Sequence, residues 1–539
     1  MTISPKSLRG ARGVAPLLLS TLLISAALTG VAAADHRPGG PTDLVATENG
    51  TVRGRSTTNG REFLGIPYAK APRGDLRWEP PKPADDWRGV RDARHHGDAC
   101  PQVKNPFSSP NYDRETRSEA CLVLNVHTPP VGRGAGAPLP VMVFMHGGGN
   151  TGGSAPDVVP DEFARRTRSV VVTINYRLGA LGFLHLPGTR GNSALLDQRK
   201  ALTWVRDNIT GFGGDRNRVT LAGQSAGGIA VCAHLASPGS RGLFHAAIME
   251  SGSIWDCQGA TRAEADSQSR TFTTALGCTG PDSAVTACMR AMPLDRILAA
   301  QSGPSAPVWW RYAAGTADLP EQPAEAFASG HASRVPVMNG STSREGLLGA
   351  YISYDAQGRE LTAAEYPGAL VAAFGAERGA QALARYPLTA YERPVYAYAA
   401  ATGDEFFSCP TFRIDRALGR RGTVYAYEFA DETSPFILPP AQPVDFRFGA
   451  AHSAELLYLY KAFGRPADLD ARQRQLAAQM TEYWGAFLHG QVPQAAGQPD
   501  MPEYRNGRVL QLRTRPAGGN AVSTTLSDDH RCDLWNAPG

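Results

Sequence analysis

The sequence predicts an α/β protein with a central, mostly parallel sheet, flanked by helices and interrupted by large helical insertions. Apolar runs of strand length stand at 141–145, 169–176 and 219–222. The first of them is continuously apolar, as in strands covered on both faces. An amphipathic helix is expected at 194–210. Because parallel neighbours need long crossover connections, the alternation of strands and helices indicates a largely parallel sheet.

The other elements follow in chain order. An Asn-Gly turn at 49–50 joins two short strands, 44–47 and 51–54, into an expected hairpin. Further strands are expected at 63–69, 122–126, 334–340 and 424–429. Further helices are expected at 228–235, within 260–300, at 453–458 and at 472–489, before a short C-terminal module.

The first 34 residues have the pattern of a secretory signal peptide. Three basic residues precede an apolar core at 14–31, and Ala32-Ala33-Ala34 supplies an A-x-A cleavage site. The arginines are not adjacent, which favours a Sec-type signal over a twin-arginine one. We therefore predict a secreted protein that is cleaved near Ala34.

Charge and hydropathy exclude several partner classes. The formal net charge of +4 falls to +1 without the signal, which carries three basic residues and no acidic one. The net charge therefore gives no reason to expect a nucleic-acid partner. No later run approaches 18 continuous apolar residues, so we expect no membrane anchor.

Eight cysteines in an exported chain favour disulfides. No pair has the C-x2-C spacing of zinc sites, so no metal or cofactor is expected. Cys232 lies in the apolar stretch that follows residue 228, and we expect it to be a buried free thiol.

Residues 223–227, Gly-Gln-Ser-Ala-Gly, lie between the strand at 219–222 and the helix at 228–235. A serine at such a strand-to-helix turn has strained backbone geometry and an exposed hydroxyl, and its neighbours two positions away must be small. The helix N-terminus behind it directs N–H groups toward a developing anion. The motif alone is weak, since a glycine-rich turn with a solvated serine has the same pattern.

A second glycine-rich loop, His146-Gly147-Gly148-Gly149, follows the strand at 141–145. Glycines allow backbone N–H groups to approach a ligand oxygen closely. Next to a nucleophilic serine they would form an oxyanion hole. The alternative is a flexible loop without function.

Several stretches together resemble the type-B carboxylesterase/lipase family, which includes the cholinesterases and has the α/β-hydrolase fold. They are 63–69, 118–126, the glycine loop, 175–177, 191–198, 212–215, the 223–227 turn and 237–252. The resemblance implies a single domain at 44–535, and the stretch before it, 35–43, is expected to be a disordered leader. The resemblance implies a serine hydrolase acting on small-molecule esters, and the signal peptide predicts that this enzyme is secreted.

The family implies a Ser-Glu-His triad of Ser225, Glu345 and His452, in the chain order of α/β-hydrolases. It also implies an oxyanion hole of Gly148, Gly149 and Ala226, and a contact from Ser251 to the triad acid. The residues alone leave other acids and histidines open. These alternatives are Asp318, Asp355 and Asp404, and His234, His245, His489 and His530.

The resemblance also implies three disulfides, Cys100–Cys121, Cys278–Cys288 and Cys409–Cys532. Cys257 is then left over, with a pairing to Cys278 as the competing possibility.

Three departures from the family pattern bear on substrate choice. Asn150 replaces a common aromatic residue and predicts a more polar pocket near the glycine loop. Trp309 and Trp310 either line the acyl pocket or pack in the core. Gln224 stands where cholinesterases have a glutamate, and the loop at 101–120 contains no tryptophan. Cholinesterases attract a quaternary ammonium group with the charge of the glutamate and with the face of a tryptophan ring. Because both are missing here, uncharged esters are the predicted substrates.

Two other functions compete with an esterase. A lipase that prefers long acyl chains would share every motif. A non-catalytic adhesion module of the same fold would have lost the serine or the histidine, and both are present.

Overall fold

The structure is a computed structural model and describes residues 43–103, 118–130, 137–303, 306–307, 309–438, 445–463 and 466–536. The expected signal peptide and most of the loop at 101–120 lie outside the described residues. The part of the chain from Asp43 onward is the unit described below.

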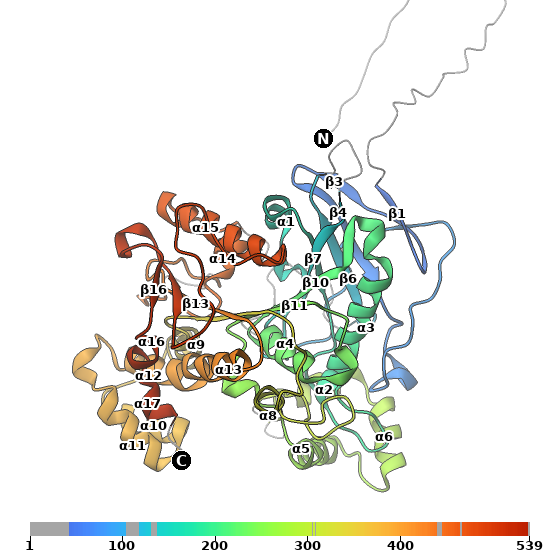
Figure 1. The fold of residues 1–539 in the computed structure, drawn as a ribbon. Coiled ribbons are helices and arrows are strands. Elements are labelled where there is room, and N and C mark those ends of the chain that lie inside the picture. Colours follow the sequence, from blue (N-terminus) through green and yellow to red (C-terminus); the bar gives the residue numbers. More distant parts are fainter. Residues whose placement is uncertain are drawn as a thin grey trace, which may run out of the picture. The chain divides into compact units, whose positions relative to one another are not determined.

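An 11-stranded sheet organises the chain in the order β16-β15-β13-β12-β11-β10-β7-β9-β6-β4-β3 (Figure 1). All pairings from β15 to β9 are parallel, and the pairings at both ends of the sheet are antiparallel. The strands are β3 Arg55–Thr57, β4 Gly60–Pro67, β6 Val123–Thr128, β7 Leu139–Met145, β9 Val170–Ile174, β10 Gly214–Gln224, β11 Ala246–Glu250, β12 Val337–Thr342, β13 Val424–Phe429, β15 Val509–Leu512 and β16 Ala521–Ser523.

The described residues form two smaller sheets as well. The predicted hairpin is present as β1 Leu44–Thr47 and β2 Gly50–Arg53, and β5 Val90–Asp92 joins it. The second small sheet pairs β8 Val158–Val159 with β14 Lys461–Ala462.

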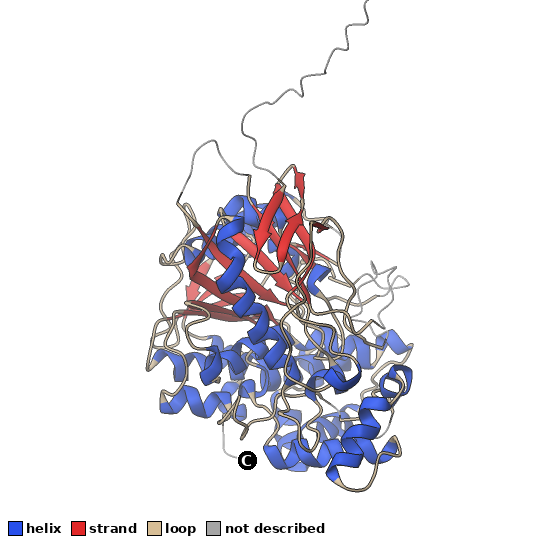
Figure 2. Cartoon of the chain, turned by 90° about the vertical axis from the view of Figure 1, so that its right-hand side faces the viewer, coloured by secondary structure: helices blue, strands red, loops and turns tan. Residues whose placement is uncertain are grey.

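Helices cover both faces of the large sheet and form the insertions (Figure 2). They are α1 Asp161–Thr167, α2 Gly179–Phe183, α3 Ser193–Asn208, α4 Ala226–Ala236, α5 Arg262–Ala275, α6 Asp282–Ala291, α7 Leu294–Ala300, α8 Pro323–Ser329, α9 Gly346–Ser353, α10 Tyr366–Phe374, α11 Ala376–Arg385, α12 Pro394–Gly403, α13 Cys409–Gly419, α14 Leu456–Leu459, α15 Ala471–Leu488, α16 Leu526–Asp529 and α17 Cys532–Trp535. A π-helical segment, Asp404–Ser408, joins α12 to α13.

The alternation of side chains along β7 separates two hydrophobic cores. Val141, Val143 and Met145 belong to the core that includes α3 and α4. Met142 and Phe144 belong to the core that includes α1 and α15. Both sets are almost completely buried, which explains why this strand is continuously apolar in sequence.

Several predicted elements differ from the structure in extent; for example, the strands expected at 63–69 and 334–340 are β4 Gly60–Pro67 and β12 Val337–Thr342. The strand expected at 219–222 is the end of the longer β10. The helix expected at 453–458 starts only at Leu456, because Ser453 has a φ of 73°, which an α-helix does not accommodate.

All eight cysteines are paired. The three pairs implied by the family resemblance are present. The expectation of a free thiol at Cys232 was wrong, because Cys232 on α4 is bonded to Cys257 in the loop after β11, with their Cα atoms 6.0 Å apart. The competing pairing of Cys257 with Cys278 was wrong for the same reason.

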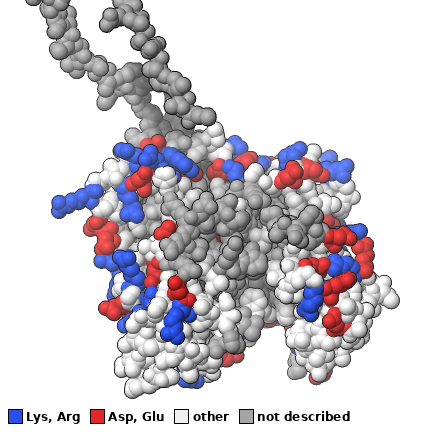
Figure 3. Space-filling model, turned by 180° about the vertical axis from the view of Figure 1, so that it is seen from behind, with Lys and Arg blue, Asp and Glu red and all other residues white. Residues whose placement is uncertain are grey.

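Charged residues on the surface have both signs. On the face seen in Figure 3, basic and acidic side chains are interspersed, and much of the lower part is uncharged. Among the described residues, no helix is long and apolar enough to cross a membrane.

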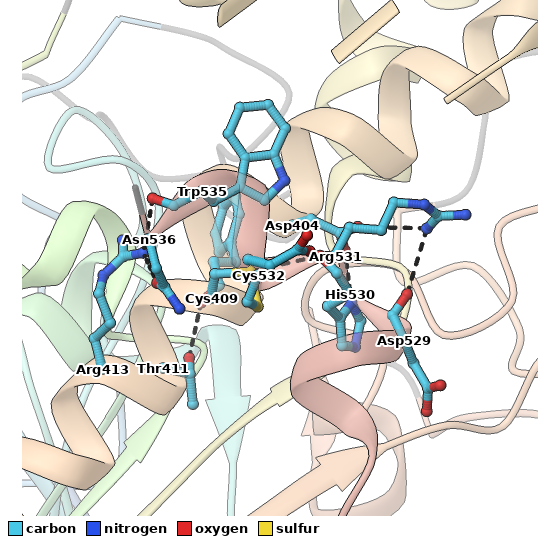
Figure 4. The surroundings of a disulfide bond; sticks show 12 residues. Asp404, Cys409, Thr411, Arg413, Asp529, His530, Arg531, Cys532, Trp535 and Asn536 are labelled. Carbon is cyan, nitrogen blue, oxygen red and sulfur yellow. Dashed lines mark hydrogen bonds and ion pairs between the residues drawn. A yellow bond between two sulfur atoms is a disulfide. The ribbon is translucent and has the colours of Figure 1, made fainter. Parts of the chain in front are cut away.

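A buried histidine joins the C-terminal segment to the sheet and to the insertion helices (Figure 4). His530 Nδ1 lies 2.6 Å from Asp404 Oδ1, and its Nε2 lies 2.6 Å from Glu428 Oε1. Burial alone would lower the pKa of His530, but the two carboxylates outweigh burial and raise this pKa well above its ordinary value. Arg531, Tyr386 and Gln511 are the other polar side chains that contact these carboxylates.

We expect His530→Asn to lower the free energy of unfolding by about 3–5 kcal/mol near pH 6, because Glu428 and Asp404 both lose the buried cation between them. Asp404 then keeps the more distant cation Arg531, at 3.9 Å. A histidine whose pKa rises on folding stabilises the folded state, and this contribution is complete at pH values below the pKa of the unfolded chain, about 6.5. That contribution is lost as the pH rises through the raised folded pKa. The difference between wild type and variant in urea unfolding should therefore shrink at alkaline pH.

Asp533→Asn is the matched control, because Asp533 pairs with Arg385 on the exposed surface nearby. It should change stability by less than about 1 kcal/mol. If the difference in free energy of unfolding between wild type and His530→Asn stays constant from acidic to alkaline pH, His530 is not protonated in the folded protein.

Candidate active site

Ser225 lies at the tight turn between β10 and α4, with φ 57° and ψ −123°. This left-handed φ is unusual for a residue with a side chain, as the motif predicted. A Cβ atom at Gly223 would lie 2.3 Å from the carbonyl oxygen of Gly227, and one at Gly227 would lie 2.0 Å from that of Met145. Glycine is therefore required at both motif positions.

Glu345 and His452 form a buried pair. His452 Nδ1 lies 2.5 Å from Glu345 Oε2. Glu345 Oε1 accepts hydrogen bonds from Ser251 Oγ at 2.6 Å and from the Thr342 N–H at 2.7 Å. With three donors on one carboxylate, the orientation of Glu345 and of the His452 ring is fixed.

Ser225, Glu345 and His452 all line one cavity of about 500 Å³. None of the alternative acids or histidines lines it. Asp318 is paired with Arg190 and Arg199, and Asp355 with Arg393.

The other histidines have partners elsewhere in the fold. His234 contacts Ser240 and Gln198, and His489 contacts the carbonyl oxygen of Thr167. The Nδ1 of His245 accepts from the Val219 N–H. His530 is enclosed by its two carboxylates.

The glycine loop adjoins the serine. Gly148 has φ 109° and Gly149 has φ 63°, and a Cβ at Gly148 would lie 2.3 Å from the Gly152 carbonyl oxygen. In the described part of the chain, no acceptor is bonded to the N–H groups of Gly148 and Gly149. The Ala226 N–H is the first of α4 and lacks an intrahelical partner. These three N–H groups remain available to a substrate oxygen.

His146 holds the start of this loop. Its ring stacks on Tyr176 at 4.4 Å, and the Tyr176 hydroxyl donates to the His146 carbonyl oxygen at 2.6 Å. Burial lowers the pKa of His146 to about 4, so its ring is neutral at physiological pH.

Asn150 lines the cavity beside the glycine loop, where the sequence predicted a polar residue, and it has a second role. Its side chain is buried, and its Nδ2 donates to the Trp310 carbonyl oxygen at 2.8 Å. The amide therefore ties the glycine loop to the segment that carries both tryptophans.

The sequence left open whether Trp309 and Trp310 line the pocket or pack in the core, and the two side chains differ in this respect. Trp309 is 48% exposed at the cavity, whereas Trp310 is buried and packs edge-to-face on Phe272 at 5.6 Å. Trp310 also reaches the cavity lining, but most of its contacts are core packing.

Two buried acids near this site had no role predicted from the sequence. Burial raises the pKa of Glu250 to about 7, although Trp484 Nε1 donates to it at 2.7 Å. Burial, followed by repulsion from Glu345 and Glu250, raises the pKa of Glu455 well above its ordinary value. In both acids, burial favours the protonated and uncharged form. Glu250 ends β11 within the family-like stretch 237–252, whereas Glu455 stands in a turn outside every motif.

Comparisons with known proteins show the family and the fold of the chain. A family model described as "Carboxylesterase family" matches residues 41–535. A human cocaine esterase is 33% identical over 500 residues, which are 88% of this chain and 86% of the relative. A para-nitrobenzyl esterase of Bacillus subtilis (strain 168) is 38% identical over 315 residues, which are 57% of this chain and 63% of the relative. A solved PNB esterase has a TM-score of 0.75 at 29% identity and covers 91% of this chain and 99% of its own.

Fold and site together define a carboxylic-ester hydrolase with the α/β-hydrolase fold. The chain belongs to the carboxylesterase family.

We expect Ser251→Ala to lower kcat by about 10- to 100-fold, because a hydrogen bond to a charged group contributes about 1.5–3 kcal/mol. KM should change much less, since Ser251 touches Glu345 rather than the cavity. Steady-state kinetics on a short-chain ester provide the measurement.

Ser253→Ala is the control, because the buried Ser253 hydroxyl donates to Asn339 instead of Glu345. Equal losses in both variants indicate general loosening of the loop and contradict the specific effect.

Proposed function

We propose that this protein is a secreted esterase that hydrolyses uncharged carboxylic esters through an acyl intermediate on Ser225. One observation carries the proposal. The pair of Glu345 and His452, joined at 2.5 Å, lines the same cavity as a serine held in a strained turn.

The first half of the reaction acylates the serine. His452 takes the proton of the Ser225 hydroxyl as its oxygen attacks the ester carbonyl carbon. Glu345 holds the imidazole in the tautomer with Nδ1 protonated and stabilises the imidazolium that forms. The imidazolium then gives the proton to the leaving alcohol oxygen. In the second half, water attacks the acyl carbon by the same route, and the carboxylic acid leaves.

The developing oxyanion would be bound by the N–H groups of Gly148, Gly149 and Ala226. These groups are fixed by the fold before substrate arrives, so they cost no reorganisation. Loss of one such donor typically costs about 3–4 kcal/mol in the transition state.

Secretion is supported by two independent features. The first 34 residues have the charge and apolar pattern of a signal peptide. All eight cysteines form disulfides, which persist in oxidising compartments.

The preference for uncharged esters is supported by the charges at the cavity. Gln224 brings an amide to the cavity instead of a carboxylate, and its Nε2 donates to Ser453 Oγ at 2.7 Å. Arg311 also lines the cavity and carries positive charge, 3.7 Å from Glu264. Both features disfavour a cationic substrate group.

We expect Ser225→Ala to reduce turnover by several orders of magnitude while the protein stays folded, because the nucleophile is lost. A fluorophosphonate probe should label Ser225 in the wild type, as read by peptide mass spectrometry. Ser353→Ala is the control, since Ser353 also lines the cavity but ends the helix α9 instead of standing at a strained strand-to-helix turn. An adduct on another serine sinks the proposal.

We expect kcat/KM for an acylcholine to be lower than for a neutral ester with the same acyl group. A missing charge at close range is worth on the order of 1–4 kcal/mol, depending on the local dielectric. Gln224→Glu should narrow the gap, because it places a carboxylate at the cavity. A wild-type preference for the choline ester contradicts the expected substrate class.

A further inference from the structure

Three consecutive residues after β11 have left-handed backbone conformations. The φ angles of Trp255, Asp256 and Cys257 are 48°, 57° and 60°. None of them is glycine, so each conformation is unfavourable on its own. Such strain persists only where the surroundings determine the conformation, and it gathers at functional sites.

Two connections hold this segment in place. Cys257 is bonded to Cys232 on α4, the helix that follows Ser225. The Asp256 carboxylate accepts two hydrogen bonds from the Arg413 guanidinium on α13, at 2.7 and 3.0 Å. The two residues that follow Trp255 are therefore fixed, one to α13 and the other to α4.

The fixed segment presents the Trp255 ring to the catalytic cavity. Trp309 meets it edge-to-face at 5.0 Å, and Phe406 of the π-helical segment meets it edge-to-face at 6.0 Å. All three rings line the cavity, and none is fully buried. They come from three distant segments, so their meeting is a product of the fold.

The position of these rings relative to the reacting atoms selects one part of the ester. A Cβ atom at Gly149 would lie 3.6 Å from Trp309, which places this ring beside the oxyanion loop. The leaving oxygen must face His452, whose ring has Phe407 as its aromatic neighbour at 5.0 Å. An alcohol portion on the His452 side would then lie toward Phe407, and an acyl portion beside the oxyanion loop would lie toward Trp309 and its neighbour Trp255.

We propose that Trp255, Trp309 and Phe406 form a subsite for an aromatic ring in the acyl part of the substrate, so that esters of arylalkanoic acids are preferred. The proposal rests on the proposed function and assigns its substrate class. An aromatic ring gains edge-to-face contacts here that a saturated ring of similar size lacks.

Ethyl phenylacetate and ethyl cyclohexylacetate test the subsite, because they share a leaving group and differ in the acyl ring alone. Hydrolysis is followed in a pH-stat with the purified mature protein. We expect kcat/KM to be higher for the phenyl ester by about 2- to 10-fold, the range of a specific aromatic contact. Trp255→Leu and Trp309→Leu should abolish this ratio, whereas Trp255→Phe and Trp309→Phe should keep most of it.

Arg413→Met tests the support of the segment, because it removes both hydrogen bonds to Asp256. It should lower the phenyl-to-cyclohexyl ratio while activity on ethyl acetate is kept. Trp87→Leu is the matched control, since Trp87 packs near the β1–β2 hairpin and does not line the cavity. Its ratio should equal that of the wild type. The exposed Trp309 keeps the test valid if Trp255→Leu fails to fold.

Three results overturn the subsite. The first is a wild-type ratio of phenyl to cyclohexyl kcat/KM near one, and the second is a ratio that stays unchanged in both leucine variants. The third is faster turnover of ethyl phenylacetate in those variants, which would show that the tryptophan rings obstruct the substrate. A failure of the proposed function is distinct, because no ester would then be hydrolysed and Ser225 would not be labelled by the fluorophosphonate probe.

Discussion

The close approach of the β10–α4 turn to the end of β7 is the constraint on which the site depends. The backbone at Gly227 lies against the Met145 carbonyl oxygen, with no room for a Cβ atom. This contact brings the strained serine next to the glycine loop that follows β7. The proposed oxyanion donors and the proposed nucleophile are therefore positioned by the same close contact between two backbone segments.

The second half of the site is attached to the same sheet from the other side. Glu345 follows β12, and its carboxylate is held by Ser251, which follows β11. Because β10, β11 and β12 are adjacent and parallel, their carboxyl ends lie together. The active site is thus a property of strand order, which explains how residues 225, 251 and 345 converge.

The sequence predicted the sheet, the strained serine and the glycine loop, because each depends on local pattern. The choice of Glu345 over Asp318, Asp355 and Asp404 came from the family resemblance alone. Local sequence does not record which acid is paired with arginine elsewhere in the fold. The disulfide of Cys232 was missed, because an apolar helix and a loop 25 residues away meet only in the folded chain. The aromatic contacts of Trp255 were missed for the same reason.

The C-terminal residues are joined to much earlier parts of the chain. β15 adds to the sheet beside β13, and Cys532 is bonded to Cys409, 123 residues before it. His530 contacts Asp404, the first residue of the segment that carries Phe406 and Phe407 to the cavity. A chain made only as far as Asp404 lacks both of these anchors, because His530 and Cys532 follow more than 120 residues later. For a secreted esterase, as proposed above, ester hydrolysis would therefore begin only after the C-terminal residues have joined the fold.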